Sequence, residues 1–404
     1  MRRSRRLKVA IAASTMTASN EAHPGLMIVL PSLDVGGTER QVALLCHGLV
    51  ELDPAWKPRL TVVVLNSGGE FERLLPDGVS IVSVRSNRML DLRAALRLRR
   101  LVHARRPDAV YSLLAPANLL AAIALVGRPE KLVWGHRTGQ VKSRRYGPRR
   151  ALATLVIRVA ARRADAAIAN SSASEEFLRS LPGLGGSINI VPNALEPNRY
   201  VQDSSVRRDQ RSQLGLEDDD LMVLSVGRLV DDKDHETLFA AFKIIRDRLP
   251  RALLFLAGPG APVAIQQRQA WAVQLSIDDA YTYLGAGHDL ANLYNAADVV
   301  VQSSTNEGSS NVLAEALAVE VPTVSTDCGN AAEMLRADNL SHVGNAPQLA
   351  EAALRSLHLP VHRYECTTPT DLAMSTLAVI LDTSQERESH GSDRTTTHDI
   401  NSVV

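Results

Sequence analysis

The strongest constraint on the fold is a repeated alternation of short apolar segments with longer stretches rich in Ala, Leu and Arg. Alternation of this kind is typical of a parallel sheet with helices on both faces. The strands predicted in the first half are residues 26–30, 60–65, 80–84, 109–113, 132–134, 166–169 and 188–191. Those predicted in the second half are residues 221–226, 252–257, 281–284, 298–301 and 323–325. The pattern therefore predicts an α/β protein with two doubly wound parallel sheets.

A polar break divides this alternation into two blocks of similar length. Residues 196–220 are polar and include the acidic run Glu217-Asp218-Asp219-Asp220. We predict a linker there, between a first domain at 26–195 and a second at 221–370, with a ligand in the cleft at the carboxyl ends of both sheets. The other predicted parts are a flexible basic segment at 1–25, a final helix at 371–382 that could return to the first domain, and a disordered tail at 383–404.

Composition narrows the class of function and indicates a compartment. Aromatic residues make up 4% of the chain, so there are few rings on which nucleic-acid bases could stack. The three cysteines are far apart, with neither metal-ligand spacing nor a disulfide framework, which favours a reducing compartment. No apolar run approaches the roughly 18 residues of a membrane span. We expect a cytoplasmic protein whose contact with a membrane would be peripheral.

Two carboxylates eight positions apart, Glu307 and Glu315, form the most informative local pattern. The residues that follow Glu307 are mostly small or polar: Gly308, Ser309, Ser310, Asn311 and Val312. A strand, a small-residue loop and a helix start are a common way to hold a phosphate, because the first-turn N–H groups are unpaired. Glu315, about two turns into the predicted helix, could accept hydrogen bonds from a diol. The alternative is a pair of surface glutamates beside an ordinary helix.

A second loop with phosphate-binding character follows the predicted strand at 221–226. It contains Gly227, Arg228 and, five residues further on, Lys233. An arginine gives a forked contact and a lysine a point charge, so the pair suits a pyrophosphate. The alternative is a solvated loop in which the neighbouring aspartates neutralise both cations.

Gly36 and Gly37 stand between the first predicted strand and a helix-like segment at 38–42. Such a pair lets backbone N–H groups approach an anion, although a tight turn alone would also explain it. The chain has neither a dinucleotide-binding glycine fingerprint nor a P-loop, which disfavours nicotinamide enzymes and P-loop NTPases. It also lacks the nucleophile elbow of serine hydrolases. No aspartate pair follows a strand as a metal site would require, so no metal is implied.

His136 follows the predicted strand at 132–134, at the edge of the first domain that faces the cleft. A lone histidine is usually structural, but this position makes it a candidate for contact with substrate. Residues 149–163 could form a helix with an apolar face and flanking arginines. Such a helix could bind anionic lipid headgroups, or it could be an ordinary surface helix packed on the sheet.

Taken together, these motifs resemble the retaining glycosyltransferases of family 4, which have the GT-B fold. The resemblance covers roughly residues 26–335. The matching motifs are Gly36-Gly37-Thr38-Glu39-Arg40, Asn170-Ser171-Ser172, Val191-Pro192-Asn193, Gly227-Arg228-Leu229, Lys233-Asp234-His235, Leu284-Gly285, Asn295-Ala296-Ala297-Asp298, the run from Glu307 to Ala318, and Ser325-Thr326-Asp327-Cys328-Gly329 with Glu333.

The resemblance implies transfer of a sugar from a nucleoside diphosphate sugar, with retention of anomeric configuration and without a metal or other cofactor. The acceptor would be a glycan, a lipid-linked glycan or a small molecule. By the resemblance, Arg228 and Lys233 would bind the diphosphate, assisted by the backbone at Gly36, Gly37, Gly227 and the loop from Gly308 to Val312. Glu315 would accept hydrogen bonds from the ribose hydroxyls. Glu307 and His136 would contact the donor sugar. Fixed cations would stabilise the leaving group.

Three departures from the family pattern concern loops. Glu320 stands where the family usually has Gly, and Ala194 replaces the usual Gly after Asn193. The segment after Glu333 lacks the familiar Gly-Leu-Leu-Val element. The alternatives to an active transferase are a catalytically inactive partner subunit and a GT-B relative such as a phosphorylase or a sugar-nucleotide epimerase. The sequence names neither the sugar, the base nor the acceptor.

Overall fold

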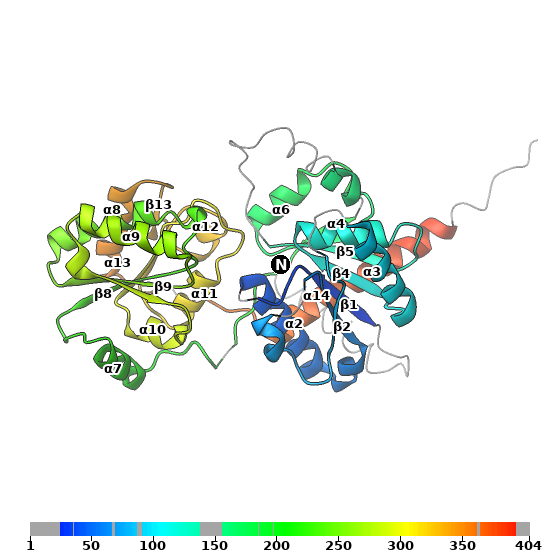
Figure 1. Ribbon diagram of the computed structural model, residues 1–404, viewed down its shortest axis with the longest axis horizontal. Coiled ribbons are helices and arrows are strands. Elements are labelled where there is room, and N and C mark those ends of the chain that lie inside the picture. Colours follow the sequence, from blue (N-terminus) through cyan, green and yellow to red (C-terminus); the bar gives the residue numbers. More distant parts are fainter. Residues whose placement is uncertain are drawn as a thin grey trace, which may run out of the picture.

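Two parallel sheets, each covered by helices on both faces, make up the protein (Figure 1). The computed structural model describes residues 25–34, 36–66, 69–86, 91–137, 156–184, 186–196, 198–361 and 364–392, with side chains up to residue 381. The α/β class with two doubly wound domains, predicted from the alternation of strands and helices, is confirmed.

The first sheet has seven strands in the order β3-β2-β1-β4-β5-β6-β7. Its strands are β1 (Leu26–Leu30), β2 (Leu60–Val64), β3 (Ser80–Ser83), β4 (Ala109–Leu113), β5 (Lys131–His136), β6 (Ala166–Ala169) and β7 (Ser187–Ile190). Its helices are α2 (Gly37–Leu52), α3 (Leu92–Arg105), α4 (Ala115–Ala124) and α6 (Ser172–Arg179). Two apolar cores, one on each face, bury the side chains of the five inner strands because both faces are covered, whereas the edge strands β3 and β7 are only partly buried.

The second sheet has six strands in the order β10-β9-β8-β11-β12-β13. Its strands are β8 (Leu221–Val226), β9 (Ala252–Ala257), β10 (Tyr281–Gly285), β11 (Val299–Gln302), β12 (Thr323–Thr326) and β13 (Leu340–Ser341). Its helices are α8 (His235–Arg248), α9 (Pro262–Gln274), α10 (Leu290–Ala296), α11 (Asn311–Ala318), α12 (Ala331–Met334) and α13 (Ala346–Ser356). The predicted strands agree with these to within a residue or two, but β13 was missed because two residues show no periodicity.

The segment predicted as a linker, residues 196–220, contains a helix, α7 (Ser204–Gln213), that belongs to the second domain. Asp203 caps this helix by accepting from the N–H groups of Ser205 and Val206. Arg207 and Arg211 reach from α7 to the carboxylate of Asp298. The linker prediction is therefore wrong for residues 204–213, which form a helix held to the second domain by two arginines.

The chain ends on the first domain. The last helix, α14 (Pro369–Ser392), packs against α2 (Figure 1). A Cβ at Gly48 of α2 would lie 2.0 Å from the carbonyl oxygen of Pro369, so only glycine permits this approach. The helix ends at Ser392 rather than at 382, which corrects the predicted start of the disordered tail. Residues 393–404, and residues 1–24 of the basic segment, lie outside the described residues.

The turn after α11 explains one departure from the family pattern. Glu320 has φ of 60°, in the left-handed region, where the family usually has Gly. The N–H of Val321 bonds to the carbonyl of Ala316, and that of Glu320 bonds to the carbonyl of Leu317. These two bonds form a Schellman motif, which favours glycine at the position of Glu320 because a side chain is strained there. The loop geometry is kept, at a cost in backbone strain.

We expect Glu320→Gly to stabilise the protein by up to about 1 kcal/mol, because relief of the left-handed strain exceeds the extra entropy of glycine in the unfolded chain. Urea unfolding would measure the change. Glu320→Ala is the matched control, since it removes the same carboxylate but keeps a Cβ in the strained position. Equal stabilities of the Gly and Ala variants would contradict the strain at this position.

Candidate active site

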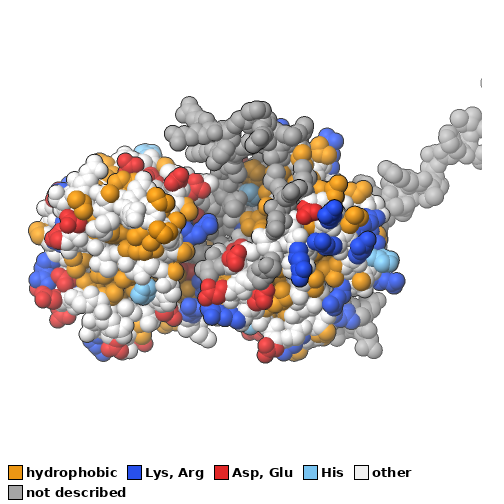
Figure 2. Space-filling model, viewed as in Figure 1, with side chains coloured by type: hydrophobic (Ala, Val, Ile, Leu, Met, Phe, Trp, Pro, Cys, Tyr) orange, Lys and Arg blue, Asp and Glu red, His pale blue; other side chains and the backbone are white. Residues whose placement is uncertain are grey.

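The residues singled out from the sequence gather where the two domains meet. Charged side chains of both signs lie along this junction (Figure 2). In the described part of the chain, no group of three or more His, Cys, Asp or Glu side chains could hold a metal ion. Nor is any described helix long and apolar enough to cross a membrane.

The loop before α11 is fixed by hydrogen bonds of Ser310 to buried side chains. The backbone N–H groups that follow Ser310 stay available to a ligand. The Ser310 hydroxyl caps the helix by accepting from the N–H of Leu313 and donates to Oε1 of Gln302 at 2.5 Å. The N–H of Ser310 donates to Oδ1 of Asn330 at 3.0 Å. Within the described residues no acceptor is recorded for the N–H groups of Asn311 and Val312. These two amides and the positive end of the helix dipole can bind an anion.

Lys233 and Glu307 form an ion pair at the edge of this loop. Lys233 ends a short 3-10 turn, Asp231–Lys233, and Glu307 also accepts from the hydroxyl of Ser304 at 2.8 Å. Gly329 permits the packing of Glu307, because a Cβ there would lie 2.7 Å from the Glu307 Cβ. The two side chains are 21% and 15% exposed. The lysine predicted to bind a diphosphate therefore already has a counter-charge in the ligand-free protein.

Arg228 is exposed and makes no ion pair among the described residues. Across the junction it interacts with the charge of Glu39 on α2, a residue to which the sequence assigned no role. Burial raises the pKa of the Glu39 carboxyl, and the positive charge of Arg228 opposes this rise. The Glu39 carboxylate lies against Gly36, where a Cβ would come within 2.3 Å of its Oε2. Arg228 is thus the cation of this site most open to a new anion.

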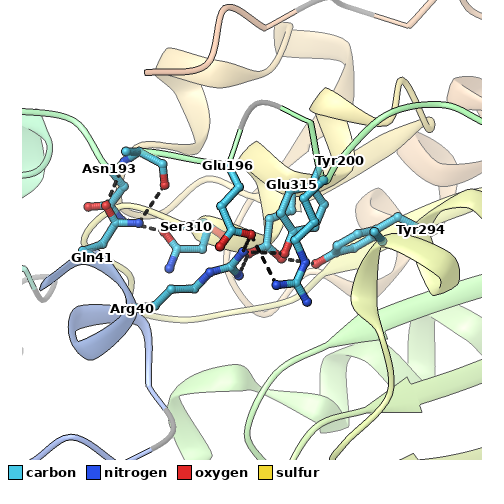
Figure 3. A network of polar contacts seen from close by, with 12 residues as sticks. Arg40, Gln41, Asn193, Glu196, Tyr200, Tyr294, Ser310 and Glu315 are labelled. Atoms are coloured by element: carbon cyan, nitrogen blue, oxygen red, sulfur yellow. Dashed lines mark hydrogen bonds and ion pairs between the residues drawn. The ribbon is translucent and has the colours of Figure 1, made fainter. Parts of the chain in front are cut away.

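A buried ion pair between Arg40 and Glu315 joins the two domains (Figure 3). Arg40 Nη1 on α2 donates to Glu315 Oε1 on α11 at 2.7 Å, and the Tyr294 hydroxyl donates to Oε2 at 2.9 Å. The second nitrogen of Arg40 donates to the Tyr200 hydroxyl at 2.8 Å and reaches Glu196 at 3.5 Å. Each oxygen of Glu315 therefore has a donor, one of them from the other domain.

The pKa shifts of this cluster follow from burial. Glu315 is 2% exposed, and burial raises the pKa of its carboxyl although Arg40 and Tyr294 lower it. Burial and the charge of Glu315 raise the pKa of Tyr294 well above its ordinary value. Burial also opposes the charge of Arg40, but Glu315 and Tyr200 outweigh it and raise the pKa of the guanidinium. A ribose diol could reach Glu315 only if Arg40 withdrew.

A second contact between the domains runs through Asn193. Its Nδ2 donates to Asn311 Oδ1 at 2.7 Å and to the carbonyl of Ser309 at 3.4 Å. Its Oδ1 accepts from Nη1 of Arg137 at 2.7 Å. A Cβ at Gly37 would lie 3.0 Å from Nδ2 of Asn311, so the start of α2 also touches the start of α11. The Gly36-Gly37 turn and the loop from Gly308 to Val312 therefore face the same space.

His136 ends β5 and is 7% exposed. Its ring stacks on Phe177 of α6, with centroids 4.2 Å apart and planes 17° from parallel. Of the other predicted residues, Gly227 follows β8 and packs against the Lys233 side chain. The sequence assigned no role to six residues of the cluster, two of which, Arg40 and Asn193, appeared only within matching motifs: Arg40, Asn193, Glu196, Tyr200, Tyr294 and Arg137. The position of Arg40, three residues after the Gly36-Gly37 pair, could have identified it as a candidate. No sequence pattern around the two tyrosines indicated their role.

Comparison with known proteins assigns both halves of the chain to one class. The model described as Glycosyltransferase Family 4 matches residues 35–199, and the model described as Glycosyl transferases group 1 matches residues 206–368. The HepE protein of Anabaena, solved with UDP and glucose, superposes with a TM-score of 0.70 over 92% of this chain and 100% of its own, at 20% identity. This likeness confirms the GT-B fold.

Curated relatives are similar over part of their length. Mannosylfructose-phosphate synthase of Agrobacterium fabrum is 31% identical over 34% of this chain and 32% of its own. A D-inositol 3-phosphate glycosyltransferase of Stackebrandtia nassauensis is 32% identical over 41% of this chain and 39% of its own. The chain spans about half the length or less of such relatives. It belongs to family 4 of the glycosyltransferases, as the two family models show.

We expect Arg40→Met to lower the free energy of unfolding by about 3 kcal/mol near neutral pH, because it leaves the buried Glu315 carboxylate unpaired. The folded state binds the Glu315 proton more tightly than the unfolded state does, so this carboxyl costs stability as pH rises through its folded pKa. Removing Arg40 raises that pKa further. The loss should therefore shrink as pH falls and Glu315 becomes protonated.

Urea unfolding at several pH values would measure this loss. Arg73→Met is the matched control, since Arg73 pairs with Glu70 on the surface, where both side chains are more than half exposed. Its effect should be small at every pH. A loss for Arg40→Met that did not change with pH would contradict the assigned role of Glu315.

Proposed function

We propose that this protein is a glycosyltransferase that moves a sugar from a nucleoside diphosphate sugar to an acceptor with retention of anomeric configuration. The observation that supports the proposal best is the start of α11, where the N–H groups of Asn311 and Val312 are open beside Arg228 and Lys233. Open amides at a helix start together with two cations match the charge and shape of a diphosphate.

The residues divide between leaving group and sugar. Arg228, Lys233 and the open amides neutralise the negative charge that grows on the diphosphate as the glycosidic bond breaks. Glu307, held by Lys233 and Ser304, binds hydroxyls of the donor sugar, and Glu315 takes the ribose hydroxyls. His136 contacts the sugar from the first domain. Neither a metal ion nor another cofactor has a role, because fixed cations supply the positive charge.

Closure of the cleft around the donor would keep water from the reacting sugar. The acceptor, by this proposal, is a glycan, a lipid-linked glycan or a small molecule that binds the first domain. Peripheral contact with an anionic membrane stays a prediction, since residues 138–155 lie outside the described residues. The solved complex of HepE with UDP and glucose supports a nucleoside diphosphate as one ligand of a protein with this fold.

The competing candidate is an inactive partner subunit of the same fold. The observation in its favour is that Glu315 and Lys233 already have partners in the ligand-free protein. We favour the enzyme because Arg228 and the two amides of α11 keep their capacity for an anion. A phosphorylase or an epimerase finds no such specific support.

We expect one of UDP, GDP, ADP and TDP to stabilise the protein, by roughly 2.7 kcal/mol at about a hundred times its dissociation constant. Thermal unfolding with each nucleotide measures the shift, which EDTA should leave unchanged. Arg228→Ala should abolish it because the exposed cation of the site is lost. Arg248→Ala, which removes a surface partner of Glu351 at the far end of α8, should keep it. No shift with any nucleotide would sink the proposal.

Retention can be tested once the donor base is known. Without an acceptor, prolonged incubation with the matching sugar nucleotide should transfer the sugar slowly to water and release the nucleoside diphosphate. The first-formed anomer of the free sugar should have the donor's configuration, as read by proton NMR before mutarotation. Glu307→Gln should slow this release by about a hundredfold if the carboxylate stabilises the transition state. An inverted first product would rule out a retaining mechanism, even if nucleotide binding is confirmed.

A further inference from the structure

Arg137 is a buried cation directly after β5 that has no carboxylate partner in the described structure. The residue is 9% exposed. Its Nη1 donates to Asn193 Oδ1 at 2.7 Å, and its Nη2 reaches the Tyr111 hydroxyl at 3.5 Å. Its Nε has no hydrogen-bond partner. Buried charges are normally paired, because a charge taken out of water is costly unless another charge compensates it.

The internal segments outside the described residues cannot supply a carboxylate either. Residues 138–155, which follow Arg137 directly, contain no Asp or Glu, and neither do residues 35, 67–68, 87–90, 185, 197 and 362–363. Other buried arginines are compensated. Arg211 pairs with Asp298, and Arg268 lies 5.0 Å from the centre of the Trp271 ring and interacts with the charge of Asp231. The hydrogen-bond partners of Arg137, by contrast, are both neutral.

Asn193 links this cation to the start of α11. The amide oxygen of Asn193 faces Arg137, and its nitrogen donates to Asn311 and to the carbonyl of Ser309. Figure 3 shows Asn193 near Gln41 of the first domain and Ser310 of the second. Asn193 is partly exposed, whereas Tyr111, on the other side of the guanidinium, is 0% exposed. Among the described residues in contact with the guanidinium, the side that an anion can approach is therefore that of Asn193.

We propose that Arg137 binds an oxyanion of a substrate, most simply a phosphate group, which takes the place of the Asn193 amide oxygen. A guanidinium offers parallel N–H donors that fit two oxygens of one phosphate, and the Nη1 and Nη2 end of Arg137 holds only the neutral groups of Asn193 and Tyr111. The inference rests on the proposed function, because the phosphate is carried either by the acceptor or by the donor diphosphate. Its chemistry is the same in both cases.

Two titrations separate these sources. The first measures the affinity of the preferred nucleoside diphosphate for the wild type and for Arg137→Gln, which keeps a hydrogen-bond donor but loses the charge. The second titrates inorganic phosphate into both proteins after saturation with that nucleotide. Loss of one charged contact should weaken the affected ligand at least about tenfold. Arg93→Gln, on the exposed first turn of α3, is the control for a general change in charge.

Each result has one meaning. If phosphate binds the nucleotide-saturated wild type and loses affinity in Arg137→Gln, the site serves an acceptor that carries a phosphate. If only the nucleotide loses affinity, the site serves the donor diphosphate. If Arg137→Gln changes neither affinity, Arg137 is structural and the inference is overturned. If the wild type binds no nucleotide but binds phosphate through Arg137, the proposed function fails while the anion site stands.

A second variant guards against misfolding of Arg137→Gln. Asn193→Asp places a carboxylate 2.7 Å from the guanidinium and so mimics the bound anion. We expect it to raise the midpoint of thermal unfolding and at the same time to weaken the affected ligand by tenfold or more. The amide of Asn311 can turn to donate to the new carboxylate. A lower midpoint with unchanged ligand affinity would contradict an anion site at Arg137.

Discussion

A buried guanidinium and a buried carboxylate, Arg40 and Glu315, meet across the boundary between the two domains. Neither charge would be tolerable alone at that depth, so each domain supplies what the other requires. Gln41, next to Arg40, exchanges two hydrogen bonds with the backbone of Ala194, where the chain leaves the first domain. One turn of α2 thus holds both the second domain and the segment that leads to it. The relative position of the two phosphate-binding turns depends on this arrangement.

The remaining charges of the site form two classes. Lys233 and Arg40 are matched by Glu307 and Glu315, whereas Arg228 and Arg137 have no ion-pair partner among the described residues. Because each matched cation has a carboxylate partner, the ligand-free protein carries no large excess of positive charge that would destabilise its fold. Unmatched cations give the cleft its attraction for an anion, which is stronger than in water because the surrounding dielectric is low. The diphosphate of the proposed donor would therefore complete this charge balance instead of disturbing it.

Local patterns predicted much of this structure, and long-range contacts account for the rest. The alternation of apolar segments predicted both sheets because strand and helix periods are local properties. The spacing of Glu307 and Glu315 predicted a loop followed by a helix start. The partner of Glu315 could not be predicted, since Arg40 lies 275 positions away. The arginines of α7 were misread for the same reason, because their partner Asp298 comes from a distant strand end.

The chain crosses between the domains twice, and the two crossings touch. Ala194 forms a parallel bridge with Thr367, and the N–H of Leu195 donates to the Thr367 carbonyl at 2.9 Å. These two crossing segments can bend more easily than the core of either domain can deform. A change in the width of the cleft would therefore be concentrated at the crossings near Ala194 and Thr367. Opening would separate Asn193 from Asn311 and Arg40 from Glu315, which would expose the Glu315 carboxylate and the first amides of α11 together. By the proposed function, a donor would replace these same contacts, so its binding would be coupled to domain movement by exchange of hydrogen bonds at the same atoms.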